Sequence, residues 1–327
     1  MSAAPASAFA PTTPATPAIE LRGLTKRFGE TLALDRVDLV VQTGAVFGFL
    51  GRNGAGKTTA LRILSGLARP TAGSAHILGH DVARASDAVR ARIGFLPDVP
   101  GFYPWMTARE CLDFAGRLFG LDDATLDARA GALLEMAGLA SITTRVGGFS
   151  RGMKQRLGIA QALINAPSLL MLDEPTSALD PIGRREVLEM VASLRGRTTV
   201  FFSTHILADV ERVCDAVAIL ERGRVVASAG IGELTARGAA NRLIVEVEGD
   251  DAAARLAQSL SGRPWLRSIE TAKATLRMTV ADLATAERDI PAAIAAAGVA
   301  LRRFEEEEAS LEDAFVELVG GGGRAAR

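Results

Sequence analysis

Hydrophobic and polar residues follow several different periods along this chain, and each period predicts a different kind of element. Residues 18–28 (AIELRGLTKRF) show the partial alternation of a half-buried strand, and residues 31–41 (TLALDRVDLVV) return as a second strand. The Gly29–Glu30 pair between them predicts a tight turn. The two segments are therefore expected to form a hairpin.

Four apolar runs are more continuous and predict buried strands of an open α/β sheet. They are residues 44–50 (GAVFGFL), 93–98 (IGFLPD), 167–175 (PSLLMLDEP) and 197–205 (RTTVFFSTH). Polar residues close the last two runs. Open α/β sheets bind their ligands at this carboxyl end of the strands, so the polar residues are candidates for a site.

Helical spacing of apolar residues marks the segments between these strands. Residues 58–67 predict one helix. Thr107 opens another, with Glu110 completing a capping box and an expected apolar stripe of Leu112, Ala115, Leu118 and Phe119. A further helix spans about 124–137 and is closed by Gly138. We interpret residues of about 100–165 as a helical subdomain inserted into the α/β fold.

Beyond about residue 236 strands and helices alternate on a smaller scale. NRLIVEVEGD, ATLRMTVAD and VALRRFEEEE predict strands, while DAAARLAQSL, ERDIPAAIAAAG and SLEDAFVELV predict helices. The chain is accordingly divided into a disordered tail (1–17), an α/β domain (18–235), an α+β domain (236–319) and a flexible tail (320–327).

Composition narrows the class of protein. The net charge of −1 and the pI of about 6.4 argue against a nucleic-acid partner. Two cysteines without framework spacing, Cys111 and Cys214, indicate a reduced cytosolic compartment and inert thiols. No apolar run approaches the roughly 18 residues of a membrane span. The proline-broken start lacks a basic segment and does not resemble a secretory signal.

The strongest chemical signal is GRNGAGKTT at residues 51–59, which follows a predicted strand and opens a predicted helix. This is the pattern of a phosphate-binding loop. Gly51, Gly54 and Gly56 allow positive φ angles and a close approach of phosphate to the backbone. Lys57 is expected to reach the β- and γ-phosphates, and the Thr58 hydroxyl is expected to bind Mg²⁺.

Asp173, Glu174 and His205 close two of the buried strands and add a second set of candidates. An aspartate at such a strand end can hold Mg²⁺ or its water, and the glutamate beside it can take a proton from water. His205 at the same sheet edge is expected to contact a γ-phosphate. Two other histidines, His76 and His80, lie near a glycine turn and are interpreted as loop residues without a metal.

Three further features admit two interpretations each. Ser150, before a long helix and among glycines, is either a simple N-cap or part of a second anion site. Phe28 either stacks on adenine or packs in the core. The aromatic cluster of Phe102, Tyr103 and Trp105 either lines a groove for a partner or packs the next helix onto the core.

The order of these segments resembles the ATP-binding-cassette family over about residues 18–235. The resemblance is to the ATP-binding subunit of exporters of the drug-resistance, daunorubicin-type branch, whose accessory C-terminal domain the segment SLEDAFVELVG also resembles. GRNGAGKTT resembles Walker A, LLMLDEP Walker B, FSRGM the signature, SALD (177–180) the D-loop and His205 the switch histidine. The implied nucleotide-binding residues are Phe28, Gly51, Asn53, Gly54, Ala55, Gly56, Lys57, Thr58, Thr59, Asp98, Ser150, Gly152 and Asp180.

Three positions depart from the family pattern. Asp98 stands where the Q-loop glutamine is usual, Arg151 where the signature has glycine, and Met153 where it has glutamine. Ser150 and Gly152, the two signature residues expected to touch phosphate, are retained. The resemblance implies Thr58, Asp98 and Asp173 as the residues around Mg²⁺.

The resemblance also implies a mechanism and partners. Two cassettes, expected to be a homodimer, would face head to tail around two ATP, with Glu174, His205 and Lys57 as catalytic residues. A separate membrane permease would hold the pair at the cytoplasmic face of the cell membrane and export the cargo. Two other hypotheses remain open at this point: a soluble nucleotide switch acting on a non-membrane partner, and a cassette that binds ATP without hydrolysing it. The retained Glu174 and His205 weigh against the second.

Overall fold

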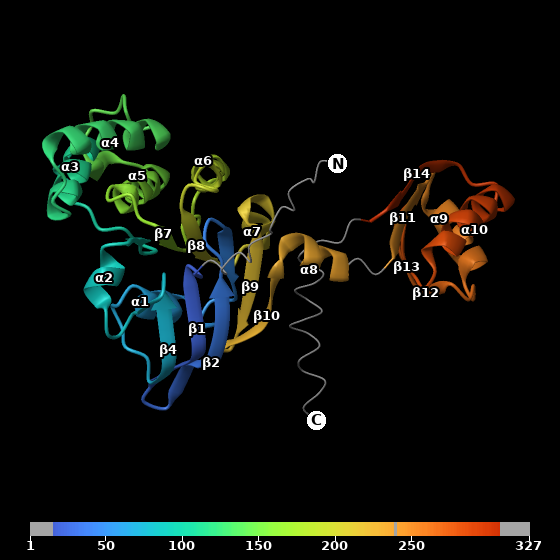
Figure 1. Cartoon of the computed structure of the whole chain (residues 1–327). Coiled ribbons are helices and arrows are strands. Elements are labelled where there is room, and N and C mark those ends of the chain that lie inside the picture. Colours follow the sequence, from blue (N-terminus) through green and yellow to red (C-terminus); the bar gives the residue numbers. More distant parts are fainter. Residues whose placement is uncertain (1–15, 239–240, 308–327) are drawn as a thin grey trace, which may run out of the picture. The chain divides into compact units, whose positions relative to one another are not determined.

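The computed structural model describes residues 16–238 and 241–307. Its chain divides into two compact units, with the boundary between Ala229 and Gly230 (Figure 1). The boundary expected from the sequence, after residue 235, falls instead within helix α8 (Ile231–Gly238). Across the described residues, no helix combines the length and the apolar composition needed to cross a bilayer.

An antiparallel sheet begins the first unit. It contains β1 (Ile19–Phe28), β2 (Thr31–Val41), β4 (Ala72–Ile77) and β5 (His80–Asp81) in the order β2-β1-β4-β5. Ile19 pairs with Val41 and Phe28 with Thr31, which confirms the predicted hairpin. His76 lies in β4 and His80 in β5, so their interpretation as loop residues was wrong: both belong to strands that pair across the Gly79 turn.

A six-stranded sheet carries the polar strand ends. Its order is β10-β9-β3-β8-β7-β6, from β3 (Val46–Leu50), β6 (Ile93–Leu96), β7 (Leu169–Asp173), β8 (Thr199–Thr204), β9 (Ala216–Glu221) and β10 (Arg224–Gly230). β6, β7, β8, β3 and β9 are parallel. Leu50 pairs with Thr204 and Asp173 with Ser203, so β3, β8 and β7 end at the same edge.

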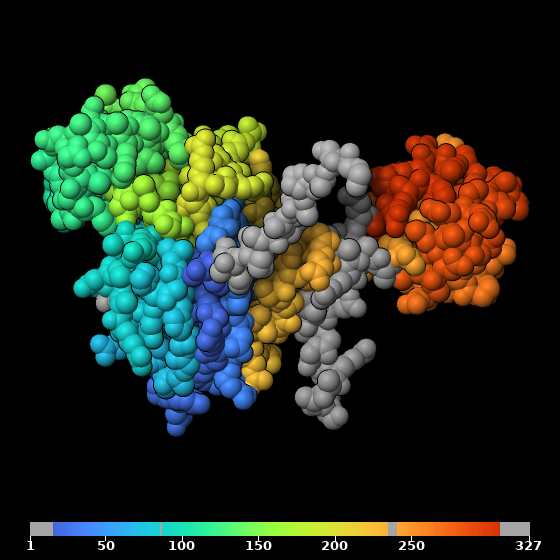
Figure 2. Space-filling view, in the orientation of Figure 1, coloured from blue at the N-terminus to red at the C-terminus, as the bar shows by residue number. Residues whose placement is uncertain are grey.

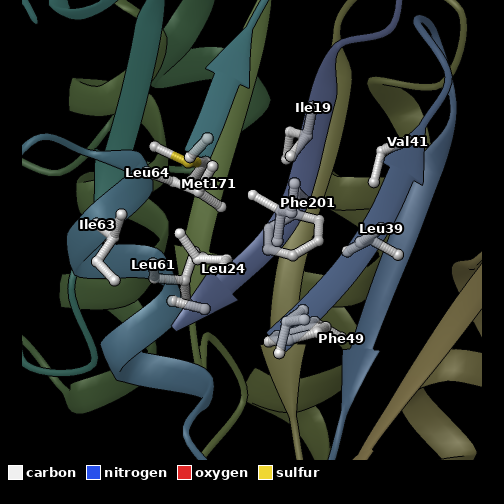
Figure 3. Close-up of a cluster of buried hydrophobic side chains, with 14 of the residues drawn as sticks. Ile19, Leu24, Leu39, Val41, Phe49, Leu61, Ile63, Leu64, Met171 and Phe201 are labelled. Carbon is white, nitrogen blue, oxygen red and sulfur yellow. The ribbon is translucent and has the colours of Figure 1, made fainter. Parts of the chain in front are cut away.

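The main hydrophobic core lies between these two sheets and helix α1 (Lys57–Leu64). Figure 3 shows Leu24 and Leu39 of the antiparallel sheet facing Phe201 of the parallel sheet, with Leu61 of α1 beside them. The rings of Phe49 and Phe201 lie 5.3 Å apart. This core fixes the start of α1 against the ends of the parallel strands, because helix and sheet share the same buried side chains.

Three helices form a lobe of their own in the first unit, seen in green in Figure 2. They are α3 (Ala108–Leu118), α4 (Asp123–Met136) and α5 (Arg151–Leu163), preceded by the short α2 (Ser86–Arg90). The predicted Thr107–Glu110 capping box is present. Leu112 and Ala115 are buried as expected, but Leu118 and Phe119 are exposed because they end α3 and line an open cavity.

Helices α6 (Pro181–Ser193) and α7 (Leu207–Val213) pack on each other after β7 and β8. The described part of the second unit begins with α8 and continues as an antiparallel sheet in the order β12-β13-β11-β14. Its strands are β11 (Arg242–Val247), β12 (Leu266–Ala272), β13 (Thr275–Val280) and β14 (Leu301–Glu306), and α9 (Asp250–Leu260) and α10 (Leu283–Ala296) lie between them in the sequence. The helix predicted near residues 310–319, the tail 320–327 and residues 1–15 of the predicted tail lie outside the described residues.

Candidate nucleotide site

The loop between β3 and α1 has the shape that the glycine pattern predicted. Gly54 and Gly56 have φ angles of 80° and 111°, in the region that glycine enters without strain. A Cβ atom on Gly51 would lie 2.5 Å from the Leu220 carbonyl oxygen, and one on Gly56 2.5 Å from the Ala33 oxygen. The loop therefore requires glycine at these positions, and it leaves the first backbone N–H groups of α1 without helical partners, as an anion site needs.

Lys57 is held at the start of α1 with its amine turned back to the loop. Its Nζ donates to the carbonyl oxygens of Gly51 at 2.6 Å and of Arg52 at 3.2 Å. Nζ also lies 3.1 Å from Oε1 of Glu174. The side chain of Lys57 is only 5% exposed, so this cation is buried with its partners and is placed where a phosphate oxygen would be attracted.

Glu174 joins the loop to the end of the neighbouring strand β8. Its N–H donates to the carbonyl and hydroxyl oxygens of Ser203, and its φ of 49° is left-handed. Its Oε2 lies 2.8 Å from Nδ1 of His205. An ionised carboxylate only accepts hydrogen bonds, which makes Nδ1 the donor and leaves Nε2 of a neutral ring as an acceptor. A carboxylate held in this way can take a proton from a water molecule.

Asp173 and Thr58 offer oxygen atoms beside the loop. Thr58 Oγ1 donates to Asp173 Oδ1 at 3.3 Å, and Ser203 Oγ donates to the same oxygen at 2.6 Å. Hydroxyl and carboxylate oxygens suit Mg²⁺, which binds through one or two protein groups, phosphates and water. Within the described ranges no cluster of three or more histidine, cysteine or acidic residues could hold a metal by itself. The residues present fit Mg²⁺ bound together with a phosphate.

Phe28 does not pack in a core. Its side chain is 54% exposed, and the amine of Lys26 lies 4.8 Å from the centre of its ring. The interpretation as an ordinary packed phenylalanine was wrong, because Phe28 is the last residue of β1 and lies beyond the buried part of the sheet. An exposed aromatic ring at this strand end is available for stacking.

The remaining predicted residues occupy helix starts. Ser150 caps α5 by accepting a hydrogen bond from the N–H of Met153, and Asp180 caps α6 by accepting one from Gly183. Gly152 lies in the first turn of α5, where a Cβ atom would come no closer than 3.5 Å to Gly183. Asn53 and Thr58 are exposed, while Ala55 is buried and Thr59 half-buried.

Asp98 turns to α5 in the described structure. The buried Gln155 donates from Nε2 to its carbonyl oxygen at 3.1 Å, and Arg151 Nη2 lies 3.8 Å from its Oδ1. No hydrogen bond or ion pair among the described residues joins Asp98 to Thr58 or Asp173. Two of the three positions that depart from the family pattern thus contact each other.

Sequence reasoning did not single out Asp209, a fully buried carboxylate in α7. It accepts hydrogen bonds from Thr176 Oγ1 and from Arg184 Nε, both at 2.6 Å. The signal in the sequence is an aspartate four residues after His205 in an otherwise apolar helix face, which is too common to be diagnostic by itself.

Comparisons with known proteins give matches to two family models and to relatives along most of the chain. The family model described as ABC transporter matches residues 34–177, and the model described as ATP-binding protein DrrA1-3-like, C-terminal domain, matches residues 230–319. The chain is 38% identical to the uncharacterized ABC transporter ATP-binding protein YxlF of Bacillus subtilis, over 92% of this chain and 99% of that protein.

Two relatives named for transport or for resistance are similar over comparable lengths. Identity is 36% to the bacitracin transport ATP-binding protein BcrA of Bacillus licheniformis (93% of this chain, 98% of that protein) and 38% to the daunorubicin resistance ATP-binding protein DrrA3 of Streptomyces coeruleorubidus (93% and 96%). Among solved structures, an ATP-binding subunit of an ABC transporter matches with a TM-score of 0.61 at 32% identity, over 67% of this chain and 92% of that chain. A dimeric cassette, MJ0796 with ADP and Pi, matches with a TM-score of 0.59 at 27% identity, over 65% of this chain and 98% of that chain.

Proposed function

The chain belongs to the ABC transporter family as the ATP-hydrolysing subunit of an exporter, and from that premise we propose that Lys57, Glu174 and His205 are its catalytic residues. The observation that carries the proposal is the position of Glu174, whose two carboxylate oxygens lie 3.1 Å from Lys57 Nζ and 2.8 Å from His205 Nδ1. A base, its orienting partner and a phosphate-binding cation thus meet at the carboxyl ends of β7 and β8.

Each side chain has a distinct task in this proposal. The backbone N–H groups of residues 51–58 and the Lys57 amine bind the phosphates. Glu174 orients the attacking water and accepts its proton, while His205 holds the carboxylate in place. Thr58 and Asp173 hold Mg²⁺, which neutralises charge on the phosphate oxygens when it is bound. Phe28 offers its exposed ring to the adenine.

A second cassette would complete the site. At the start of α5, Ser150 accepts a hydrogen bond from the N–H of Met153, and the other N–H groups of the first turn are expected to be able to bind an anion. We assign this helix start to the phosphates of the nucleotide held by a facing copy. The 27% identical cassette solved as a dimer with ADP and Pi supports this arrangement. Asp98 and Asp180 belong to the segments expected to respond to nucleotide in that pair.

The exposed aromatic residues near α3 are the surface we assign to the permease. Two adjoining cavities of about 340 and 460 Å³ share Gly101, Phe102 and Gln161 in their walls. Tyr103 and Trp105 are 47% and 59% exposed beside them, with their rings 5.1 Å apart. An apolar groove of this size fits a short helix of a membrane protein. Binding there would hold the chain at the cytoplasmic face of the membrane.

Similarity to named exporters over nearly the whole chain supports export rather than a soluble switch. Those relatives are named for bacitracin, daunorubicin and Nod factor, and their range gives no single cargo for this chain.

The test is the Glu174→Gln variant of the purified full chain. It should bind Mg²⁺-ATP at least as tightly as wild type does, but hydrolyse it about 10²–10⁴-fold more slowly, because general-base action is lost. It should also elute as an ATP-dependent dimer in size-exclusion chromatography. Hydrolysis at the wild-type rate would reject Glu174 as the base. A monomer at saturating ATP would reject the facing pair for the isolated subunit.

A further inference from the structure

Asp209 is a buried charge that the proposed reaction does not use. Its side chain has no exposed surface, and both of its carboxylate oxygens accept hydrogen bonds, one from Thr176 and one from Arg184. Thr176 is only 1% exposed. A carboxylate is rarely buried in a protein unless it is fully paired, and the pairing here is complete.

The two partners of Asp209 lie on the segment that follows Glu174. Thr176 comes two residues after Glu174, and Arg184 lies in the first turn of α6. Asp209 itself comes four residues after His205. The segments that carry the proposed base and its orienting histidine are therefore joined twice, once by the Glu174–His205 hydrogen bond and once, behind it, by Asp209. A single contact would let one segment pivot about the other, whereas two contacts fix their relative orientation.

The segment after Glu174 needs such support. Glu174 and Ala178 have φ angles of 49° and 53°, which are unfavourable for residues with a side chain. Residues 177–180 lie between Thr176 and Arg184, so the same carboxylate holds the chain on both sides of them. Leu179, Arg184 and Asp209 line a cavity of about 370 Å³, so this segment is not packed on every side and depends on the Asp209 contacts for its position.

We propose that Asp209 is a positioning residue that keeps Glu174 and His205 in hydrogen-bonding distance by anchoring Thr176 and Arg184. The inference rests on the proposed roles of Glu174 and His205. Asp209 touches neither nucleotide nor water in this proposal, since its side chain is fully buried. It acts on the rate of hydrolysis and leaves the phosphate loop, which Lys57 and the glycines form, unchanged.

Thr176 offers the sharpest test, because substitution by valine removes its hydroxyl group and keeps the shape of the side chain. Thr176→Val should lower kcat at least about tenfold while the Kd for ATP changes less than about twofold, since positioning affects the transition state more than binding. Thr176→Ser restores the hydroxyl and should recover most of the rate. Rescue by serine distinguishes the hydrogen bond from packing.

Arg184 and Arg185 provide a matched pair. Arg184→Met removes a partner of Asp209 and should lower kcat, whereas Arg185→Met removes a mostly exposed arginine that pairs with Glu189 and should not. Melting temperatures report whether each variant folds. Wild-type kcat in both Thr176→Val and Arg184→Met would overturn the inference, as would equal losses in the valine and serine variants. If Glu174→Gln itself hydrolyses ATP normally, the proposed function fails instead.

Discussion

Lys57 Nζ lies 3.1 Å from Glu174 Oε1, and the two side chains are only 5% and 12% exposed. The cation expected to bind phosphate thus forms an ion pair with the carboxylate expected to activate water. A nucleotide phosphate that approaches Lys57 has to replace this partner. We therefore expect binding and activation to be linked at this contact, because a phosphate that displaces Glu174 from Lys57 would leave the carboxylate free to bind a water molecule.

Lys57→Ala should abolish measurable ATP binding, since the phosphates lose their counter-charge. It should also lower the free energy of unfolding by up to about 3 kcal/mol, because the buried Glu174 carboxylate loses its cationic partner and, among the described residues, keeps only its hydrogen bond to His205. Nucleotide titration and denaturant unfolding measure the two effects. The double variant Lys57→Ala/Glu174→Gln should partly recover the free energy of unfolding, but it should not recover the affinity for ATP. Unaltered ATP affinity in the single variant would remove Lys57 from the site.

Because Asp98 and Arg151 contact each other, we predict that substitutions at these two positions have coupled effects on the free energy of unfolding. Both positions depart from the family pattern. Both side chains are 49% exposed and 3.8 Å apart, so the pair is worth at most about 1 kcal/mol. Asp98→Arg alone should lower stability by repulsion, and Asp98→Arg/Arg151→Asp should recover it. A double-mutant cycle of unfolding free energies measures the coupling. Additive effects would show that the two residues are independent.

Tyr103→Ala with Trp105→Ala should weaken binding to the permease with little change in ATP affinity. The rings contact each other and Phe114, and they lie away from the phosphate loop in sequence and in contacts. Loss of aromatic anchors at an interface commonly costs about 2 kcal/mol or more. Co-purification with the permease tests this, with Val40→Ala, another exposed apolar residue, as the control. A large fall in melting temperature would instead favour a packing role.

A chain that ends after Ala229 should fold and bind ATP. The unit boundary lies there, and every residue assigned to the nucleotide precedes it. The two units have separate hydrophobic cores, so removal of the second exposes none of the first core's central residues. Circular dichroism and nucleotide titration are the measurements. An unfolded product would reject the two-domain division.

Both cysteines should resist alkylation in the native protein. Burial raises the pKa of the Cys111 thiol to about 11, and burial raises that of Cys214 further. Alkylation requires the thiolate, so at pH 8 both should react slowly in the folded chain and quickly after unfolding. Stability should also fall as the pH rises above about 8.5, the pKa of an unfolded thiol, because only the unfolded chain then ionises. Rapid native labelling at pH 8 would contradict the burial of both sites.

Local patterns predicted most of the fold and of the site. The phosphate loop, the polar strand ends and the caps at Thr107 and Ser150 each depend on a few adjacent residues, and the structure has them where the sequence placed them. Strand β12 was missed because its side chains are mostly exposed and carry little apolar pattern. β9 and β10 were not assigned at all.

Contacts between segments that are distant in the sequence could not be predicted from the sequence alone. Asp209 meets Thr176 and Arg184 only because α7 packs against α6, and Arg151 meets Asp98 only because α5 lies beside the end of β6. Neither pair has a spacing that a single sequence makes recognisable. Leu118 and Phe119 were expected to be buried, because helical periodicity shows which face of a helix is apolar. It does not show where the neighbouring elements stop covering that face, and both residues are exposed.

The left-handed backbone of Glu174 places strain at the residue that is expected to act as the base. A side chain at a φ of 49° costs about 1–2 kcal/mol that glycine would avoid. Replacement by glycine would therefore relax the turn while removing the base. The same change would leave the buried Lys57 amine without its carboxylate partner, so we expect no net gain in the free energy of unfolding from relaxing this turn.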